Sequence, residues 1–318
     1  MKATTGPLPS GPDWAYELKL DGMRLLVEVA TTGVRAWSSN GREATATFPE
    51  VAALGPALAP LECLLDGEVV AFDSGGRPSF ERLQHRMHIG SAAEAAHRAA
   101  EVPIELVVFD LLRLGDRDTS PMPWHNRRHL LDQLADQLPA GVSVATVFDD
   151  GERLLEACEA RGLEGVIAKR RDTAYVPGTR SRHWVKVKVR RHQEVVVGGW
   201  APGEGRRSGV MGSLLVGYYD NEQAASPVFR YAGRVGSGLT DHELGRLAAL
   251  LAPLASDVCP FEPPPPPLVA REAHWVRPEV VVEVEFGHWT DENRLRHPVY
   301  LGQRIDTEPT AVIREPEL

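Results

Sequence analysis

The sequence predicts an α+β fold in two domains, residues 1–190 and 191–318. The chain has 318 residues, which is enough for two domains of ordinary size. Up to about residue 190, strand patterns alternate with helix patterns. After that point, short strands split by glycine-rich turns surround one amphipathic helix, a pattern that predicts a small β-barrel such as an OB-fold.

In the first domain, the local patterns predict strands and helices in turn. Residues 14–37 predict two joined strands with turns at Asp21-Gly22 and Thr32-Gly33. The apolar run 61–72 predicts a strand interrupted at Asp66-Gly67-Glu68. We expect helices at 48–58, 79–86 (capped by Ser79), 92–100, 126–138 and 152–161 (ended by Gly162), and further strands at 104–112, 165–168 and 184–189.

In the second domain, glycine and proline mark the turns between strands. Thr240 and Glu243 form a capping-box pattern, which predicts a helix over 240–254. Five consecutive prolines within 259–268 predict a stiff loop. The predicted strands are 194–200, 213–219, 228–235 and 280–286.

The overall composition is typical of a soluble globular protein, with 43% hydrophobic and 25% charged residues. No apolar run approaches the roughly 18 residues that span a membrane, and the N-terminus lacks the apolar core of a signal peptide. The three cysteines are far apart and outside any C-x-x-C pair, so we expect neither disulfides nor a zinc site. These features predict a cytoplasmic protein without a membrane partner.

The charge distribution is uneven along the chain. The formal net charge of −9 by itself argues against a nucleic-acid partner. Residues 169–191, however, contain nine Lys or Arg and one acidic residue, Asp172. Binding of a polyanion depends on such a local patch more than on the total charge. A solvated cluster without a ligand is the alternative.

The stretch from Tyr16 to Arg24 carries the first candidate site. Its residues alternate, so a half-buried strand would place Glu17, Lys19 and Asp21 on one face and the apolar residues on the other. A solvated surface is the simpler interpretation of these charges. If Lys19 is instead a nucleophile, its pKa must be lowered or its proton removed, through burial, nearby cations or a metal-bound phosphate.

Two further lysines fit a phosphate site. Lys186 and Lys188 lie two residues apart on a predicted strand, so both side chains face the same side and can reach one polyphosphate. The alternative is an edge strand protected by lysines.

Two acids and one aromatic residue complete the candidate set. Glu68 and Glu164 each lie next to a glycine in an apolar strand context, where an unpaired carboxylate would be costly. Mg²⁺ suits such carboxylates together with substrate phosphates, whereas exposed turn acids are the alternative. Phe109 fits either a core position or a platform on which a base stacks.

Together these segments resemble the covalent nucleotidyltransferases, and most closely the ATP-dependent DNA ligases. The resemblance covers about residues 16–308, and five motifs follow in the family's order. The last segment resembles the end of the bacterial end-joining type. The segments are E-L-K-L-D-G-M-R (17–24), D-G-E (66–68), V-F-D-L-L (108–112), E-G-V-I-A-K (164–169), W-V-K-V-K (184–188) and L-R-H-P-V-Y-L-G-Q-R-I-D (295–306).

The resemblance implies a nucleotidyltransferase (adenylation) domain with mixed or antiparallel sheets, followed by an OB-fold domain. It implies that Lys19 becomes covalently adenylated and that Glu68 and Glu164 bind Mg²⁺ or Mn²⁺. Arg304 would swing over from the second domain to orient the leaving pyrophosphate. The other residues implied to bind ATP are Glu17 and Phe109 (adenine), Arg24 and Glu68 (ribose and reacting phosphate), and Lys169, Lys186 and Lys188 (phosphates).

The resemblance also implies a substrate and partners. The substrate would be nicked or broken duplex DNA, held through its phosphates by Arg42, Arg170, Arg180 and Arg182. About a dozen residues precede the first motif, so we expect a minimal, monomeric, nucleoid-associated ligase with a weak grip on DNA. A Ku-like end-binding protein or a separate repair polymerase or primase would then assist it.

Two positions depart from the family pattern. Ser39 stands where the family has arginine, so Arg42 would have to contact the 5′-phosphate of the DNA. Thr307 stands where the last motif has lysine, which would weaken adenylation. The alternatives are an RNA ligase or RNA-capping guanylyltransferase, and a non-catalytic nucleic-acid-binding module of the same fold.

Overall fold

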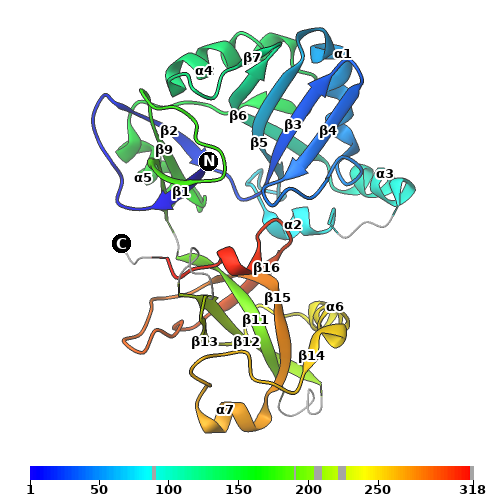
Figure 1. Ribbon diagram of the computed structural model, residues 1–318, viewed down its shortest axis with the longest axis vertical. Helices are drawn as coiled ribbons and strands as arrows, with labels where there is room; N and C mark the ends of the chain where they lie inside the picture. The colour runs from blue at the N-terminus through cyan, green and yellow to red at the C-terminus, as the bar shows by residue number, and fades with distance from the viewer. Residues whose placement is uncertain (88–90, 190, 204–209, 221–226, 316–318) are drawn as a thin grey trace. The chain divides into compact units, whose positions relative to one another are not determined.

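The computed structural model describes residues 1–87, 91–189, 191–203, 210–220 and 227–315. The chain divides into two compact units, Met1–Arg190 and Arg191–Glu317 (Figure 1). Within the described ranges, no helix is long and apolar enough to cross a membrane.

The first unit contains a four-stranded sheet in the order β1-β10-β9-β2. β1 runs parallel to β10, and the other pairs are antiparallel. Helix α5 (Gly151–Arg161) covers one face, where Tyr16, Val166 and Ala168 pack against Leu154 and other apolar side chains (Figure 1). The strands are β1 (Lys2–Thr5), β2 (Trp14–Lys19), β9 (Gly165–Arg170) and β10 (Arg180–Lys188).

The second sheet of this unit has the order β4-β3-β5-β6-β7, and β8 pairs in parallel with β6. The prediction of two joined strands over 14–37 is therefore wrong: this range forms three strands, and the first belongs to the other sheet. The strands are β3 (Met23–Ala30), β4 (Gly33–Ser38), β5 (Cys63–Ala71), β6 (Ile104–Leu114), β7 (Arg117–Asp118) and β8 (Val142–Val144).

The predicted interruption at Asp66-Gly67-Glu68 is also wrong, because β5 runs through it without a break. A Cβ atom on Gly67 would lie 2.9 Å from the backbone oxygen of Val107 on β6. The glycine therefore allows a close approach of two strands, where the sequence suggested a turn. Only the pairing register shifts at this point.

Helices connect the strands of the first unit, and several predicted caps are confirmed. The side chain of Ser79 accepts a hydrogen bond from Arg82 N at the start of α2 (Phe80–Gln84), as predicted. Asp150, which the sequence did not indicate as a cap, accepts in the same way from Arg153 N at the start of α5. Gly162 ends α5 with φ 66°. The remaining helices are η1 (Pro49–Ala53), α1 (Leu54–Leu58), η2 (Ala59–Leu61), α2 (Phe80–Gln84), α3 (Ala92–Glu101), α4 (Trp124–Asp132) and η3 (Ala135–Gln137).

The second unit is a small barrel. Its strands pair in the order β13-β12-β11-β15, and β16 also pairs with β15. A parallel bridge between Ser237 and Val299 links the end of β13 to β16 and closes the circle. This five-stranded closure is the predicted OB-type barrel. The strands are β11 (His192–Pro202), β12 (Met211–Tyr219), β13 (Phe229–Val235), β15 (His274–Glu285) and β16 (Val299–Arg304), with the short β14 (Ala255–Ser256) beside β15.

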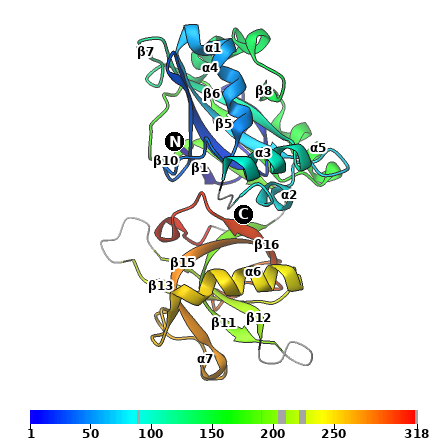
Figure 2. The same ribbon diagram turned by 90° about the vertical axis from the view of Figure 1, so that its right-hand side faces the viewer.

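Helix α6 (Asp241–Leu251) lies along the outside of the barrel strands (Figure 2). Its Leu244, Leu247 and Leu251 belong to the barrel core, and Thr240 caps it by accepting from Glu243 N. The five-proline segment is not a loop throughout, because its last member begins α7 (Pro267–Glu272). The described part of this unit also contains two 3₁₀ turns, η5 (Ala252–Leu254) and η6 (Pro309–Ala311).

Candidate active site

A pocket within the first unit is lined by residues from both of its sheets. β2 supplies Glu17 and Lys19, and β9 supplies Lys169. The second sheet supplies side chains from β3, β5 and β6. The lining residues are Ala3, Glu17, Leu18, Lys19, Leu20, Arg24, Glu68, Phe109, Ala145, Ile167, Lys169 and Trp184.

The strand register explains why the predicted lysines share one face. Lys19 lies opposite Gly165, and Gly165 lies opposite Lys188 on the next strand. One row further, Glu17, Ile167 and Lys186 are aligned in the same way. Directly opposed residues of antiparallel strands point to the same side, so these side chains all belong to the face away from α5. β10 has β1 and β9 as neighbours, which excludes the edge-strand alternative.

Gly165 sits between the two lysines of the first row, at a position that excludes a side chain. Its φ is +149°, and a Cβ atom there would lie 2.0 Å from the backbone oxygen of Val187. The glycine of E-G-V-I-A-K thus permits the close pairing of β9 with β10.

The amine of Lys19 forms an ion pair with the carboxylate of Glu164. The side chain of Lys19 is 20% exposed and that of Glu164 is 4% exposed. The expectation that Glu164 requires a cation partner is therefore met by the candidate nucleophile itself.

Glu17 and Lys169 form a buried ion pair on the same face of this sheet. Lys169 Nζ lies 2.7 Å from Glu17 Oε2 and donates to the backbone oxygen of Phe109 at 3.3 Å. It also lies 4.4 Å from the ring centroids of both Phe109 and Trp184. Burial lowers the pKa of Lys169 and raises that of Glu17, while each partner opposes the shift of the other.

This burial changes the interpretation of Lys169. The residue is 1% exposed and its ammonium is engaged by a carboxylate, a carbonyl and two rings. It therefore supports Glu17, in contrast to the predicted phosphate contact. The other carboxylate oxygen, Glu17 Oε1, is buried and has no hydrogen-bond partner among the described residues, although Arg128 Nη1 lies 3.8 Å away.

Arg24 lines the pocket with its guanidinium held in a fixed geometry. Its Nε and Nη2 donate to the two oxygens of Asp66 at 2.8 and 2.5 Å. Nη2 also donates to Tyr175 Oη at 3.0 Å, and Nη1 donates to Met1 O at 2.6 Å. The sequence did not indicate that Asp66 and Tyr175 take part in this arrangement. Asp66 could have been predicted as a site residue because it belongs to the D-G-E motif, whereas Tyr175 lies outside every motif.

The buried ion pair between Arg127 and Asp110 anchors strand β6, which supplies Phe109 to the pocket. Arg127 on α4 donates from Nε and Nη2 to the two oxygens of Asp110 on β6, both at 2.7 Å. Asp110 follows Phe109, so the pair fixes β6 where the aromatic ring enters the pocket. The ring of Phe109 meets Trp184 edge-on, with centroids 5.9 Å apart.

The second unit holds Arg304 among three acids. Its Nε and Nη2 donate to Asp306 at 3.0 and 2.9 Å, Nη1 lies 3.3 Å from Glu283, and Nε lies 3.7 Å from Glu194. Burial opposes the charge of Arg304, but these carboxylates raise its pKa above the usual value. Thr307, the departure from the family pattern, donates from Oγ1 to Glu194 Oε1 at 2.7 Å.

The four arginines predicted to contact DNA lie outside the pocket lining. Arg42 and Arg182 are exposed. Arg170 pairs with Asp172 at 2.9 Å, and Arg180 donates weakly to Ala3 O at 3.4 Å. Ser39 is exposed in the turn that follows β4.

Comparison with known proteins decides the family. Residues 8–188 match the ATP dependent DNA ligase domain, and residues 207–307 match the ATP dependent DNA ligase C terminal region. The chain belongs to the ATP-dependent DNA ligase family. The predicted resemblance and fold class are thereby confirmed, since the two matched regions are the nucleotidyltransferase and OB-fold parts of such ligases.

Ligases of this family named LigD are among the similar proteins. The multifunctional non-homologous end joining DNA repair protein LigD of Mycobacterium tuberculosis is 41% identical over 317 residues, covering 99% of this chain and 39% of that protein. The LigD of Pseudomonas aeruginosa is 34% identical over 310 residues, covering 96% of this chain and 35% of its own. The chain thus spans roughly two fifths of these relatives.

Two solved structures are similar along the whole chain. The mycobacterial DNA ligase D complexed with ATP and MES has 38% identity and a TM-score of 0.65, with 99% of this chain and 98% of that chain covered. The ligase domain of M. tuberculosis LigD has 40% identity and a TM-score of 0.53, with 99% and 97% covered.

Proposed function

We propose that this chain seals nicks or ends in duplex DNA through a lysyl-AMP intermediate on Lys19, in DNA repair by end joining. The observation that carries the proposal is the position of the Lys19 amine, in contact with Glu164 and on the wall of the pocket. The family match and the LigD relatives support the same activity.

ATP would bind with its adenine between Glu17 and the ring of Phe109. Glu17 Oε1 is a buried acceptor with an unfilled hydrogen bond among the described residues, which suits the exocyclic amino group of adenine. Guanine presents a carbonyl oxygen at that position, and two acceptors repel. Arg24 would contact the ribose and the reacting phosphate, and Lys186 and Lys188 would contact phosphate oxygens from the adjacent strand.

The first chemical step is attack by Lys19 Nζ on the α-phosphorus of ATP. A P–N bond forms, the bond between the α-phosphorus and the bridging oxygen breaks, and pyrophosphate leaves. The amine must lose a proton to supply its electron pair, and the Glu164 carboxylate in contact with it is the nearby acceptor.

The residues present fit a divalent cation. Glu68 lines the pocket, and Glu164 lies outside the lining but contacts Lys19, which belongs to it, so both carboxylates would lie near a phosphate bound at Lys19. Oxygen donors of this kind suit Mg²⁺ or Mn²⁺. When bound, the ion would neutralise charge on the phosphate oxygens.

In the later steps, AMP moves to the 5′-phosphate of the DNA and the 3′-hydroxyl displaces AMP to seal the strand. Arg42, Arg170, Arg180 and Arg182 would hold the DNA backbone, and the binding would be insensitive to sequence. Arg304 must exchange its bonds to Asp306 and Glu283 for phosphate oxygens before it can orient pyrophosphate.

The LigD names support a role in end joining, and the wider assignments extend that proposal. We infer a monomer that works in the cytoplasm at the nucleoid, with a Ku-like end-binding protein or a separate repair polymerase or primase supplying additional grip on broken DNA. Sealing of broken ends at low protein concentration should therefore increase when such a partner is added.

The deciding experiment incubates the protein with α-labelled ATP and Mg²⁺. We expect a covalent label on the protein that Lys19→Ala abolishes and that α-labelled GTP does not produce. Labelling by GTP would indicate a capping-type enzyme, and sealing of RNA but not DNA nicks an RNA ligase. Full labelling of Lys19→Ala would place the nucleophile elsewhere, and no labelling of the parent protein would indicate a non-catalytic module.

A further inference from the structure

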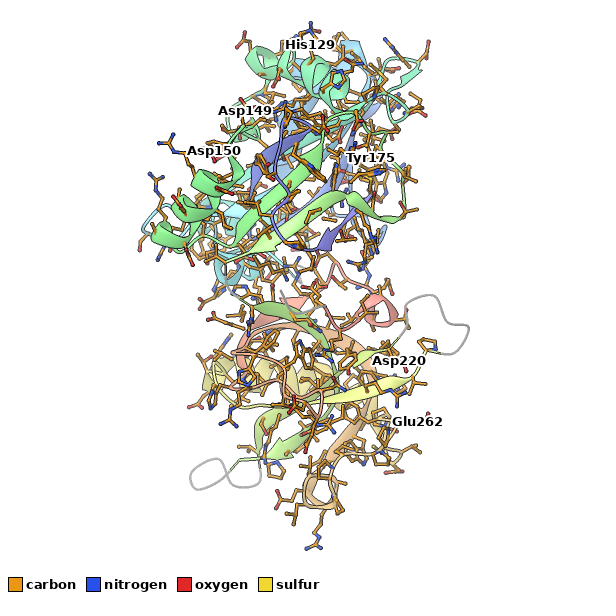
Figure 3. All side chains as sticks on the ribbon, turned by 90° about the vertical axis from the view of Figure 1, so that its left-hand side faces the viewer. His129, Asp149, Asp150, Tyr175, Asp220 and Glu262 are labelled. Atoms are coloured by element: carbon orange, nitrogen blue, oxygen red, sulfur yellow. The ribbon has the colours of Figure 1, made fainter. Side chains whose placement is uncertain are left out.

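Tyr175 is a buried tyrosine in the segment between β9 and β10, in the first unit (Figure 3). It is 5% exposed, and its backbone N–H donates to Ser120 O at 2.8 Å, so the residue is fixed at both ends. Neither the motifs nor the proposed chemistry gives it a role.

The hydroxyl of Tyr175 completes a triangle with two charged groups. It donates to Asp66 Oδ2 at 3.0 Å and accepts from Arg24 Nη2 at 3.0 Å. Burial, followed by the charge of Asp66, raises the pKa of Tyr175, so the hydroxyl keeps the proton that it donates.

The ring of Tyr175 is fixed as well. It meets Trp184 edge-on with centroids 5.8 Å apart, and Arg127 Cζ lies 5.8 Å from its centroid. Trp184 on β10 and Arg24 on β3 both line the pocket, and Tyr175 contacts both of them.

These contacts leave one donor of Arg24 for a ligand. A guanidinium has five N–H hydrogens. Within the described part of the chain, the Nε hydrogen, both Nη2 hydrogens and one Nη1 hydrogen have acceptors in Asp66, Tyr175 and Met1. The second Nη1 hydrogen remains, on a residue that lines the pocket.

We propose that Tyr175 is a positioning residue for Arg24, fixing the guanidinium so that this remaining donor meets the ribose or α-phosphate of the nucleotide. The inference rests on the proposed function. Asp66 and Met1 O accept three of the guanidinium hydrogens, and the hydroxyl of Tyr175 accepts the second Nη2 hydrogen, which further restricts the rotation of the guanidinium. Because the side chain of Arg24 is already ordered, ATP binding does not have to include the entropic cost of fixing it.

The test compares Tyr175→Phe with Tyr16→Phe in formation of the lysyl-AMP label. Tyr16 is also buried, and its hydroxyl donates to Pro9 O at 2.8 Å on the α5 side of β2, so it controls for the loss of one buried hydroxyl bond. Labelling is a single-turnover reaction, so KM here is the ATP concentration that gives half of the maximal labelling rate. For Tyr175→Phe we expect this KM to rise about tenfold with the maximal rate constant within about twofold, as for an interaction made equally in the ground and transition states. Tyr16→Phe should leave KM unchanged.

Repeating the Tyr175→Phe substitution in an Arg24→Lys variant distinguishes an effect through Arg24 from a general loss of stability. Arg24→Lys keeps a positive charge beside Asp66 but has no Nη2 for Tyr175, so adding Tyr175→Phe to it should change KM by less than about twofold. A full additional tenfold rise there would show that Tyr175 acts independently of Arg24 and would overturn the inference.

The remaining outcomes are also decisive. An unchanged KM in Tyr175→Phe, with normal labelling of the parent, would refute the positioning role and leave the proposed function standing. If the parent is not labelled by ATP, the proposed function fails and the inference fails with it. If Tyr175→Phe does not fold by circular dichroism, 3,5-difluorotyrosine at this position keeps the ring and weakens the acceptor, and an unchanged KM there would equally refute the role.

Discussion

At the scale of single residues, the pocket is built on buried ion pairs, in which each charge is neutralised by a neighbouring side chain and not by water. Glu17 and Lys169 are 3% and 1% exposed. Asp66 and Asp110 each accept two hydrogen bonds from one arginine, through its Nε and Nη2 atoms. The sequence identified Glu17 and Lys169 as site residues, but not as partners, because 152 positions separate them and only the β2–β9 pairing brings them together.

Lys169→Met should destabilise the first unit strongly. It leaves the carboxylate of Glu17 buried without its cation, a change that typically costs about 3–5 kcal/mol. The measurement is chemical denaturation of the full chain. Adding Glu17→Gln should recover much of the lost free energy of unfolding, since the amide is neutral. A stable single variant would mean that Arg128 or water replaces Lys169.

The buried thiol of Cys63 should make the stability of the protein depend on pH. It is fully buried at the start of β5, and burial raises the pKa of its thiol from 9.0 to about 11. The folded-state pKa is raised, so this contribution is complete below about pH 9 and is lost as the pH rises through about 11.

The shift of about two pKa units corresponds to roughly 3 kcal/mol of unfolding free energy over the whole transition, of which roughly 2 kcal/mol should be lost by pH 10.5. Other groups titrate in the same range, so the measurement is the difference between the parent and Cys63→Ala at pH 8 and pH 10.5. The variant should be less stable at pH 8, because a cavity remains, and should lose less between the two values. Parallel curves would argue against a buried neutral thiol.

At the scale of elements, strand β9 determines the site. It lies between β2 and β10, so the two rows that contain Lys19, Lys188, Glu17 and Lys186 all cross it. Alternation within one strand predicted which side chains share a face. The pairing of three strands distant in sequence was not predictable from that pattern, because period-two alternation carries no information about the partner strand.

Gly165→Ala tests the role of β9. A methyl group there would meet Val187 O at 2.0 Å, and the backbone φ is +149°, so the β9–β10 pairing must shift. We expect lysyl-AMP formation to fall at least about 100-fold, because small displacements of a nucleophile have large effects on rate.

The matched control for this prediction is Gly55→Ala in α1. There the nearest atom is Val34 Cγ2 at 3.4 Å and the substitution favours the helix. Activity should be retained. Normal labelling of Gly165→Ala would mean that the site tolerates a different register.

At the scale of the whole molecule, a net charge of −9 coexists with a basic segment at 169–191. The structure gives part of this segment other partners: Lys169 is buried, Arg170 is paired with Asp172, and Arg171 is paired with Asp149. Arg180 and Arg182 remain exposed and are the stronger candidates for DNA phosphates.

Replacing Arg180 and Arg182 together with alanine should weaken binding of a nicked duplex and reduce its salt dependence. Each lost phosphate contact should lower the slope of log K against log salt by about one. Fluorescence anisotropy between low and moderate salt measures this slope. Arg98→Ala on α3, whose partner is Glu101, is the control and should leave the slope unchanged. An unchanged slope in the double variant would move the DNA-binding surface elsewhere.

The sequence by itself determined the fold class, the family and several helix caps, and it predicted half of the residues that line the pocket, since local periodicity, capping and motif order are properties of short segments. Tertiary structure alone decided which charges neutralise which. The pairing of Lys19 with Glu164, of Glu17 with Lys169, and of Arg24 with Asp66 and Tyr175 arises from strands and segments far apart in the chain. The physical reason is that a buried charge is stable only beside a partner, and the partner is chosen by sheet register and not by sequence distance.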